Sequence, residues 1–289
     1  MSSLKYLLPA EKVGMGGMYL DQPFPTQKVQ QIDPFLLLHH HNGKAKKGIH
    51  PRDQGVGPHP HRGFSPVTFI LQGETHHRDS RGNSSIVKAG GVQWLKSGLG
   101  VIHSERPSND MAALGGRSEI IQLWINSRAA NKMDEPEYQA LSSEEIPTIS
   151  ESGVSTQVIA GLFQGNKGPI KTDFPTTALM VEFTEDGEFT GELPAGWNGF
   201  IYPIYGDLQF SGFGLVDKKA AGVLREGVFS FSSKAGNKVL IMMGEPTDEK
   251  VTQHGPFVMN TQTEVLEAMR DYQMGKMGFL VEEFEPFEG

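Results

Sequence analysis

Two histidines flank a proline in the segment "GPHPHRGFSPVTFILQGE" (57–74), just before an alternating apolar run. Side chains at positions i and i+2 of an extended chain point to the same side, so His59 and His61 can converge on one point. A second pair with this spacing, His103 and Glu105, lies in "VIHSERP". If the two strands face each other across a barrel, three imidazoles and one carboxylate meet at one site.

Such a donor set suits a divalent transition metal. Imidazole binds Fe, Ni, Cu or Zn, and the carboxylate adds hard character and one negative charge. Four protein ligands on an octahedral ion leave two positions for water, dioxygen or a chelating substrate. A single His-x-His more often marks a loop or a hydrogen-bonded histidine, but two such pairs beside strands bounded by glycines favour a metal site.

The remaining histidines are weaker candidates. Nine of the ten histidines lie at or before position 103, and His254 is the only later one. In "LLLHHHNG" (36–43), neighbouring side chains alternate between faces, so at most His39 and His41 could share a site. We expect this run to be a polar strand end that enters a turn.

The segment "ETHHRDSRGN" (74–83) is typical of a strand that runs into a hairpin. His76 and His77 should face apart, and we expect both to be exposed. No Gly-x-Ser-x-Gly elbow, Gly-x-Gly-x-x-Gly motif or phosphate-binding loop is present, which argues against a serine hydrolase and against nucleotide chemistry.

Composition excludes other classes of function. The formal net charge of −8 over 289 residues argues against direct nucleic-acid binding, and "KAKKG" (44–48) is expected to be a solvated loop. Cysteine is absent, so disulfides, thiolate metal sites and a cysteine nucleophile are excluded. No segment approaches the ~20 apolar residues of a membrane span, and the N-terminus does not resemble a signal peptide. We expect a soluble protein of the cell interior.

The pattern of short apolar runs between turn residues predicts a mostly β protein. Expected strands cover 67–73, 90–98, 119–126, 177–184, 199–210, 227–232 and 237–244. The polar stretch 132–149 lacks a strand period and is predicted to be a linker with one helical turn at most.

A helix is predicted over 261–274, because Thr261 and Glu264 have capping-box spacing. Its apolar face should comprise Val265, Leu266, Met269 and Tyr272.

The two halves resemble each other weakly when Gly63 is laid over Gly196 and Gly73 over Gly206. This match predicts a duplicated β domain. We assign residues 1–135 to an N-terminal barrel with the metal site, 136–150 to a linker, and 151–289 to a C-terminal barrel plus the helix.

The C-terminal barrel is expected to hold no metal. The alignment places His59 over Glu192 and His61 over Pro194, and proline cannot be a ligand. The expected counterpart of the strand with His103 is "NKVLIMMG" (237–244), which carries no donors at its centre.

At this point a family resemblance is visible. "HPHRGF" (59–64), "QWLKSGLGVIHSE" (93–105) and "QHGPFVMNT" (253–261) occur in an order that resembles the pirin family of the cupin superfamily. The resemblance implies an all-β fold of two tandem cupin barrels, a bicupin, with a short C-terminal helix. It also implies one non-haem Fe(II) per chain, with four protein ligands: His59, His61, His103 and Glu105.

Two positions depart from the family pattern. This chain has Ser65 where the family often has Glu, and His39 where it often has an acidic residue. Neither is a ligand in the family pattern. Strand alternation counted from His59 and His61 places Ser65 on their face, which makes it a candidate pocket residue.

The resemblance implies a quercetin 2,3-dioxygenase that acts on a flavonol and dioxygen. Glu105 would be both ligand and catalytic base, unless a hydroxide on the ion takes the proton.

The alternative is an iron- and redox-dependent protein-interaction module in transcriptional or metabolic control, without turnover. The acidic net charge suits a protein partner better than nucleic acid. A fold with a purely structural metal is a third reading, less favoured because structural sites are usually closed. We expect a monomer without membrane association, located in the cytoplasm or, in a eukaryote, also in the nucleus.

Overall fold

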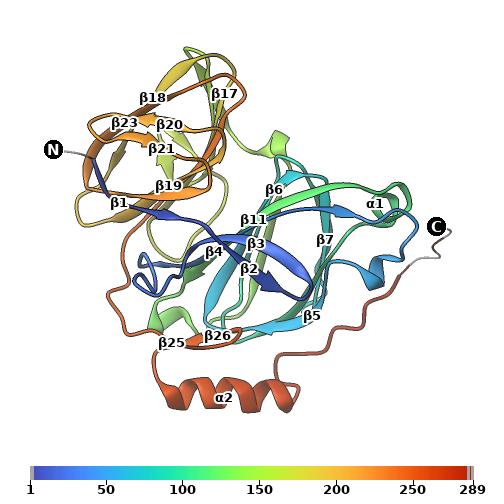
Figure 1. The fold of residues 1–289 in the computed structure, drawn as a ribbon. Coiled ribbons are helices and arrows are strands. Elements are labelled where there is room, and N and C mark those ends of the chain that lie inside the picture. Colours follow the sequence, from blue (N-terminus) through green and yellow to red (C-terminus); the bar gives the residue numbers. More distant parts are fainter. Residues whose placement is uncertain (1–2, 285–286, 288–289) are drawn as a thin grey trace. The chain divides into compact units, whose positions relative to one another are not determined.

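The computed structural model describes residues 3–284 and 287, which form two compact units built mainly of β-strands (Figure 1). The first unit combines His39–Ser143 with the described residues from Thr247 onward. The second combines Glu144–Pro246 with the described residues through Leu38. Each unit therefore uses two stretches of chain, whereas the sequence assignment divided the chain at a single linker.

The first unit contains the candidate metal ligands. Its elements are β4 (Phe35–Ala45), η1 (Pro51–Asp53), β5 (Val56–His61), β6 (Phe64–Gln72), β7 (Glu74–Asp79), β8 (Ser84–Lys88), β9 (Val92–Lys96), β10 (Val101–Arg106), α1 (Asn109–Leu114), β11 (Gly116–Asn126), η2 (Ala129–Asn131), β12 (Glu137–Leu141), β25 (Thr252–His254), β26 (Phe257–Met259) and α2 (Gln262–Gln273). Strand β4 begins before the first residue of this unit and extends into it.

The second unit is made of strands apart from one short 3-10 turn at its start. Its elements are β1 (Leu4–Pro9), β2 (Glu11–Met15), β3 (Met18–Phe24), η3 (Ser143–Glu145), β13 (Thr148–Glu151), β14 (Val154–Ala160), β15 (Leu162–Phe163), β16 (Asn166–Lys167), β17 (Thr176–Phe183), β18 (Gly187–Leu193), β19 (Asn198–Tyr205), β20 (Leu208–Phe210), β21 (Gly214–Val216), β22 (Ala220–Leu224), β23 (Gly227–Ser233) and β24 (Lys238–Gly244).

The two units share one topology, which confirms the predicted duplication of a β-barrel. The four-stranded sheet β5-β10-β7-β8 of the first unit corresponds strand for strand to β18-β23-β20-β21 of the second. The facing sheet contains the run β9-β6-β11-β4 in the first unit and β22-β19-β24-β17 in the second. Each of the seven expected strands coincides with observed strand structure.

The expected linker contains a strand that the sequence analysis missed. Within 132–149, β12 pairs antiparallel with β9, and Tyr138 lies opposite Leu95. This segment has no clear alternation because most of its side chains are half-buried rather than alternately buried and exposed. The β12 strand therefore completes the sheet of the first barrel.

The second barrel is filled by aromatic rings. Phe231 packs near Phe183, Phe189 and Phe210, with ring centroids 5.3 to 6.1 Å apart. These rings belong to a buried cluster that also contains leucine and valine side chains from both sheets. Apolar burial on this scale is the main favourable term in folding such a barrel.

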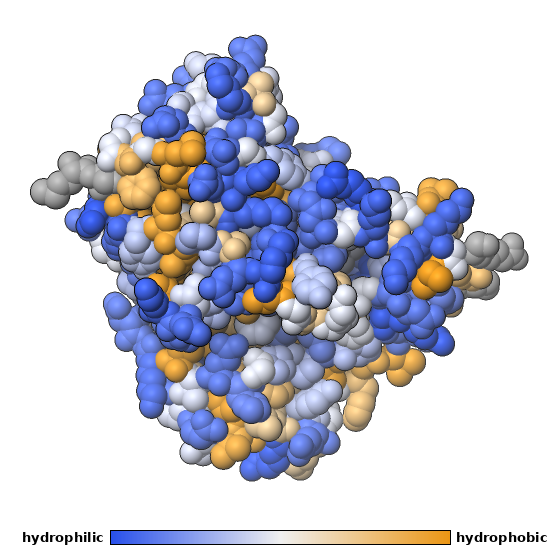
Figure 2. Space-filling model, viewed as in Figure 1, coloured by the Kyte–Doolittle hydropathy of each residue, from blue (hydrophilic) through white to orange (hydrophobic). Residues whose placement is uncertain are grey.

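The described residues contain no helix that is long and apolar enough to cross a membrane. Hydrophilic side chains predominate on the face of the molecule shown in Figure 2, with hydrophobic ones dispersed among them.

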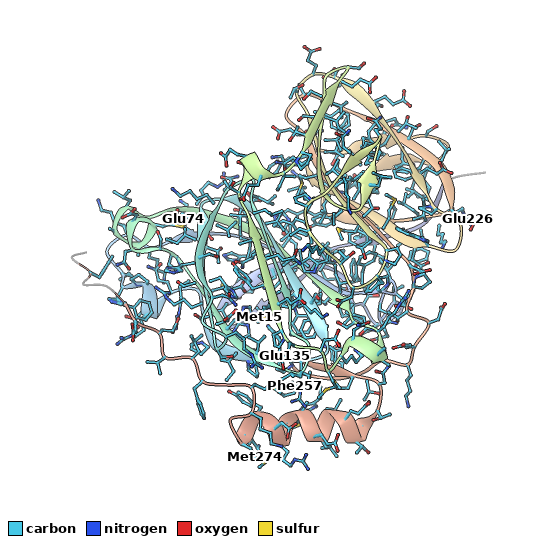
Figure 3. All side chains as sticks on the ribbon, turned by 180° about the vertical axis from the view of Figure 1, so that it is seen from behind. Met15, Glu74, Glu135, Glu226, Phe257 and Met274 are labelled. Atoms are coloured by element: carbon cyan, nitrogen blue, oxygen red, sulfur yellow. The ribbon has the colours of Figure 1, made fainter. Side chains whose placement is uncertain are left out.

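Helix α2 begins with the predicted capping box. Thr261 accepts a hydrogen bond from the backbone N–H of Glu264, whose side chain accepts one from the Thr261 N–H. The predicted apolar face was partly wrong: Val265 and Ala268 are buried, but Leu266 and Tyr272 are exposed. The helix lies beside β26, where Phe257 is buried next to it (Figure 3).

The outer face of β10 is covered by the C-terminal part of the chain. Ile102 belongs to a buried apolar cluster with Phe257, Ala268 and Met277. Four residues further along, Arg106 donates two hydrogen bonds to the carboxylate of Glu282, at 3.0 and 2.9 Å. Side chains at alternate positions of β10 are thus held from outside, which leaves the other positions to face the barrel interior.

We expect Phe231→Ala to lower the free energy of unfolding by about 3 to 5 kcal/mol, because it leaves a cavity among aromatic rings. Val228→Ala on the same strand is the control. Val228 is 66% exposed, so its truncation should change stability by no more than about 0.5 kcal/mol. Urea unfolding of the two variants measures both effects, and equal midpoints would contradict this account of the core.

Candidate metal centre

The candidate ligands lie on two neighbouring strands, β5 and β10, and β7 flanks β10 on its other side. In the ladder between β5 and β10, His59 lies opposite His103. On the other side of β10, His103 lies opposite Asp79 and Glu105 lies opposite His77. Cross-strand neighbours point to the same face of a sheet, so these side chains all face the interior of the first barrel.

A tight turn fixes the end of β5 next to the site. Gly63 has φ +85°, and a Cβ at this position would come within 2.0 Å of the carbonyl oxygen of Val258. The buried amine of Lys132 donates hydrogen bonds to the carbonyl oxygens of Gly63 and Val258 and to Asn126. The chain therefore turns sharply two residues after His61, and only glycine fits there.

The structure brings the three predicted histidines together. One ring nitrogen each of His59, His61 and His103 lies within 4.8 Å of the others. Ligands about 2.1 Å from a common ion lie at most about 4.2 Å apart, so small side-chain rotations suffice to close the shell. No other such group was found among residues 3–284 and 287.

The hydrogen bonding of these rings fits a metal site. His59 donates from Nδ1 to the carbonyl oxygen of Gly57 at 2.8 Å, which leaves the lone pair of Nε2 free. The Nε2 atoms of His61 and His103 are buried and have no hydrogen-bond partner among the described residues. Buried imidazole nitrogens without a partner, as in His61 and His103, are costly unless a cation binds them.

The same burial keeps two of the rings neutral. Burial lowers the pKa of His61 well below its ordinary value, and the charge of His59 lowers it further. The pKa of His103 is likewise well below its usual range because of burial and of the neighbouring histidines. Neutral imidazole is the form that binds a metal.

Glu105 lies next along β10 on the same face, but its oxygens are not part of the three-histidine group. Oε1 accepts hydrogen bonds from Thr68 at 3.0 Å and from Gln93 at 2.6 Å, and Oε2 accepts one from Gln122 at 2.9 Å. A carboxylate has about four lone-pair directions, so one remains available on Oε2. The role of Glu105 as a fourth ligand stays a prediction.

Aromatic side chains adjoin the histidines. The ring of Phe64 lies 5.0 Å from that of His61, and Trp124 lies 5.5 Å from His61 and 4.3 Å from Phe64. Ser65 was expected on this face, but Phe64 and Thr68 occupy it, so Ser65 points to the opposite side of β6. The turn at Gly63 resets the alternation, which could not be counted through it from His61.

The prediction for His77 was also wrong. This histidine was expected to be exposed, but it is buried on the inner face of β7, and its Nε2 lies 3.1 Å from Asp79 Oδ2. Its i,i+2 spacing to Asp79 is the same signal that identified the other two pairs. His76 does face the other way, where it contacts Ser84.

The histidine run 39–41 lies within β4 rather than at its end. His40 is fully buried and lies 3.0 Å from Glu119. Burial lowers the pKa of His39 to about 4. His254 is exposed on β25.

The equivalent positions in the second barrel carry no donors. In the β18–β23 ladder, Gly191 lies opposite Phe229 and Leu193 opposite Gly227, matching the pairs His59–His103 and His61–Val101. Two residues beyond Phe229, Phe231 takes the place of Glu105. A Cβ on Gly191 would come within 2.7 Å of the Phe229 ring.

The expected counterpart of the strand with His103 was wrong. By sheet order it is β23 and not the 237–244 segment, which forms β24 and corresponds to β11. The physical reason for expecting no metal in the second barrel therefore changes: two phenylalanine rings fill the space where the first barrel has His103 and Glu105.

We expect His61→Ala and His103→Ala each to reduce metal affinity by more than about 100-fold while the protein stays folded. Loss of a ligand should lower metal affinity by more than the 10- to 100-fold typical of residues that only orient a ligand. The barrel should stay folded, because its apolar core does not need the ion for stability. Metal analysis beside thermal melting measures both effects. His254→Ala is the control, and full occupancy in either ligand variant would refute the assignment.

We also expect metal titration of the full chain to saturate at one ion. Within the described part of the chain the donor set occurs once, and its counterpart in the second barrel is Gly191, Leu193, Phe229 and Phe231. Saturation at two ions would contradict this expectation and reveal a second site.

Comparison with known proteins places the chain in a family. The family model "Pirin" matches residues 17–125, and "Pirin C-terminal cupin domain" matches 178–278. A pirin-like protein of Solanum lycopersicum is 36% identical over 95% of this chain and 92% of its own. Human pirin is 37% identical over 87% of this chain and 85% of its own. A crystal structure of quercetin 2,3-dioxygenase from Acinetobacter baumannii is 33% identical and covers 96% of this chain and 99% of that one, with a TM-score of 0.88. With both barrels matched by its models, this bicupin belongs to the pirin family.

Proposed function

We propose that this protein is an iron(II)-dependent flavonol 2,3-dioxygenase, with quercetin as its test substrate. The observation that carries the proposal is the convergence of three histidines, two of them buried with unpartnered Nε2 atoms, beside a hydrogen-bonded carboxylate. The similarity to a quercetin 2,3-dioxygenase of known structure supports the same reaction class.

The donor set fits the proposed ion. His59, His61 and His103 would hold it, with Glu105 as a fourth ligand through the remaining lone pair of Oε2. Imidazole and carboxylate donors suit iron(II). When bound, the ion would supply Lewis-acid activation of the flavonol oxygens and redox chemistry toward dioxygen.

Glu105 is the base that we assign to the first proton transfer. Three donors and no acceptor face its oxygens, which is the pattern of an ionised carboxylate. Oε2 would accept the proton of the flavonol 3-hydroxyl at the lone pair that the Gln122 amide releases. Gln93 and Thr68 hold Oε1 meanwhile, so the carboxylate moves about a fixed point.

The aromatic side chains suit a planar aromatic substrate. Trp124 is only half-buried, and its indole N–H donates to Gln122 Oε1 at 3.2 Å, which fixes the ring. Phe64 lies against one side of it. Rings fixed in this way can stack on a flavonol without further loss of side-chain entropy.

The direct test is quercetin turnover by purified, iron-loaded protein. We expect loss of the flavonol absorbance, uptake of dioxygen and release of carbon monoxide. An interaction module would instead show no turnover and a redox-dependent capture of a protein partner. That result would refute the proposed dioxygenase activity.

Glu105→Gln should lower kcat by about 10²- to 10⁴-fold, because the amide keeps the size of the side chain but cannot accept the proton. Iron content must be measured in the same samples, because a lost ligand would also lower activity. Glu188→Gln, at an exposed position of the second barrel, is the control. A Glu105→Gln variant with normal activity would show that Glu105 is not the base.

A further inference from the structure

Behind the three histidines lies a fourth that the proposed ligand set does not use. His77 is 1% exposed and faces the barrel interior from β7, opposite Glu105 in the ladder. It is not part of the three-histidine group. A buried imidazole beside a metal site needs a partner for both ring nitrogens.

Both nitrogens of His77 have one. Its Nδ1 lies 3.4 Å from Nδ1 of His103, and its Nε2 lies 3.1 Å from Oδ2 of Asp79. The chain of contacts therefore runs from the Asp79 carboxylate through His77 to the back of a candidate ligand. The distance between the two Nδ1 atoms is at the long end for a hydrogen bond, so the contact is weak. Its effect is to orient the His103 ring rather than to stabilise the fold.

The carboxylate of Asp79 determines which ring nitrogens of His77 and His103 carry a hydrogen. An ionised carboxylate only accepts, so His77 must donate from Nε2, and its Nδ1 then carries a lone pair. That lone pair accepts the hydrogen of His103 Nδ1. His103 is thereby left with its lone pair on Nε2, the atom that is buried without a partner.

Asp79 is well placed to impose this direction. Oδ1 accepts the backbone N–H groups of Arg81 and Asn83, at 2.9 and 3.0 Å, and Oδ2 also accepts the Asn83 side chain at 2.8 Å. Burial acts to raise the pKa of Asp79, but the hydrogen bonds from His77, Asn83 and Arg81 outweigh it and hold the pKa below its ordinary value. The hairpin after β7 thus presents a fixed negative charge to His77.

The plane of the His77 ring is fixed from the side. Tyr138 of β12 stacks on it with a centroid distance of 4.0 Å and an interplanar angle of 6°. The Tyr138 hydroxyl lies 2.6 Å from Ser85 Oγ and donates to Gln93 Oε1 at 3.3 Å. Gln93 in turn donates to Glu105, so one network supports both His103 and Glu105.

We infer that Asp79 and His77 are positioning residues for the metal centre: the carboxylate sets the tautomer of His77, which sets the tautomer of His103 and presents His103 Nε2 to the ion. This inference rests on the proposed metal site and deepens it. Neither residue touches the ion or the substrate, so the expected effect is on metal affinity and ligand field rather than on a chemical step.

Asp79→Asn is the most specific test, because it reverses the direction of the hydrogen bond to His77 while the side chain keeps its shape. The backbone N–H groups of Arg81 and Asn83 should hold the amide oxygen at the Oδ1 position, which turns the amide N–H groups toward His77. His77 Nε2 would then accept, and its Nδ1 hydrogen would force His103 to carry its own hydrogen on Nε2. We expect Co(II) affinity, measured by chelator competition, to fall about 10- to 100-fold.

A pair of His77 variants separates orientation from packing. His77→Asn keeps an acceptor at the position of Nδ1, whereas His77→Leu removes it at similar volume. The asparagine variant should bind Co(II) more tightly than the leucine variant, and the Co(II) absorption bands of both should differ from those of the unaltered protein. His76→Ala, one residue away on the outer face, should bind Co(II) normally.

The outcomes distinguish an incorrect metal site from an incorrect positioning role for Asp79 and His77. If the unaltered protein takes up no Co(II), the metal site itself is wrong and the inference falls with it. If it binds Co(II) and the Asp79→Asn and His77→Leu variants bind it equally well with the same spectrum, only the positioning role is refuted. Thermal melting of the metal-free variants shows whether any loss comes from unfolding instead.

Discussion

The register of β10 against its two neighbours is the constraint on which the site depends. One ladder sets His103 opposite His59, and the other sets His103 opposite Asp79 and Glu105 opposite His77. A slip by one residue would turn every one of these side chains to the other face. The hydrogen bonds of a central strand therefore do more for the metal centre than any single contact among its ligands.

The strand is held in this register from its outer face. Ile102 packs against the C-terminal part of the chain, and Arg106 binds Glu282 through two hydrogen bonds. The C-terminal segment of a cupin is thus part of the support of its metal site, although it contributes no candidate ligand. This also explains why the compact first unit includes residues from Thr247 onward.

Local spacing was enough to find the three histidines, because alternation along a strand is a property of the chain alone. The duplicated β domain was predicted from the matching glycines of the two halves, and the cupin barrels from the family resemblance. Local spacing failed where neighbouring elements decide. His77 is buried by pairing with β10, which its own segment does not reveal. Ser65 was misplaced because the positive φ of Gly63 resets the alternation, and the equivalent of β10 was misassigned because sheet order is not chain order.

The two barrels show how little of the fold has to change to make or remove a site. Phe229 and Phe231 in the second barrel stand where the first has His103 and Glu105, and the strand order is the same. The aromatic pair adds apolar burial, whereas the polar pair needs partners for every buried nitrogen and oxygen. Those partners, Gln93 and Gln122 for Glu105 and His77 for His103, come from three further strands. The chemistry of the first barrel therefore depends on a coordinated set of side chains around its ligands, which a barrel topology by itself does not supply.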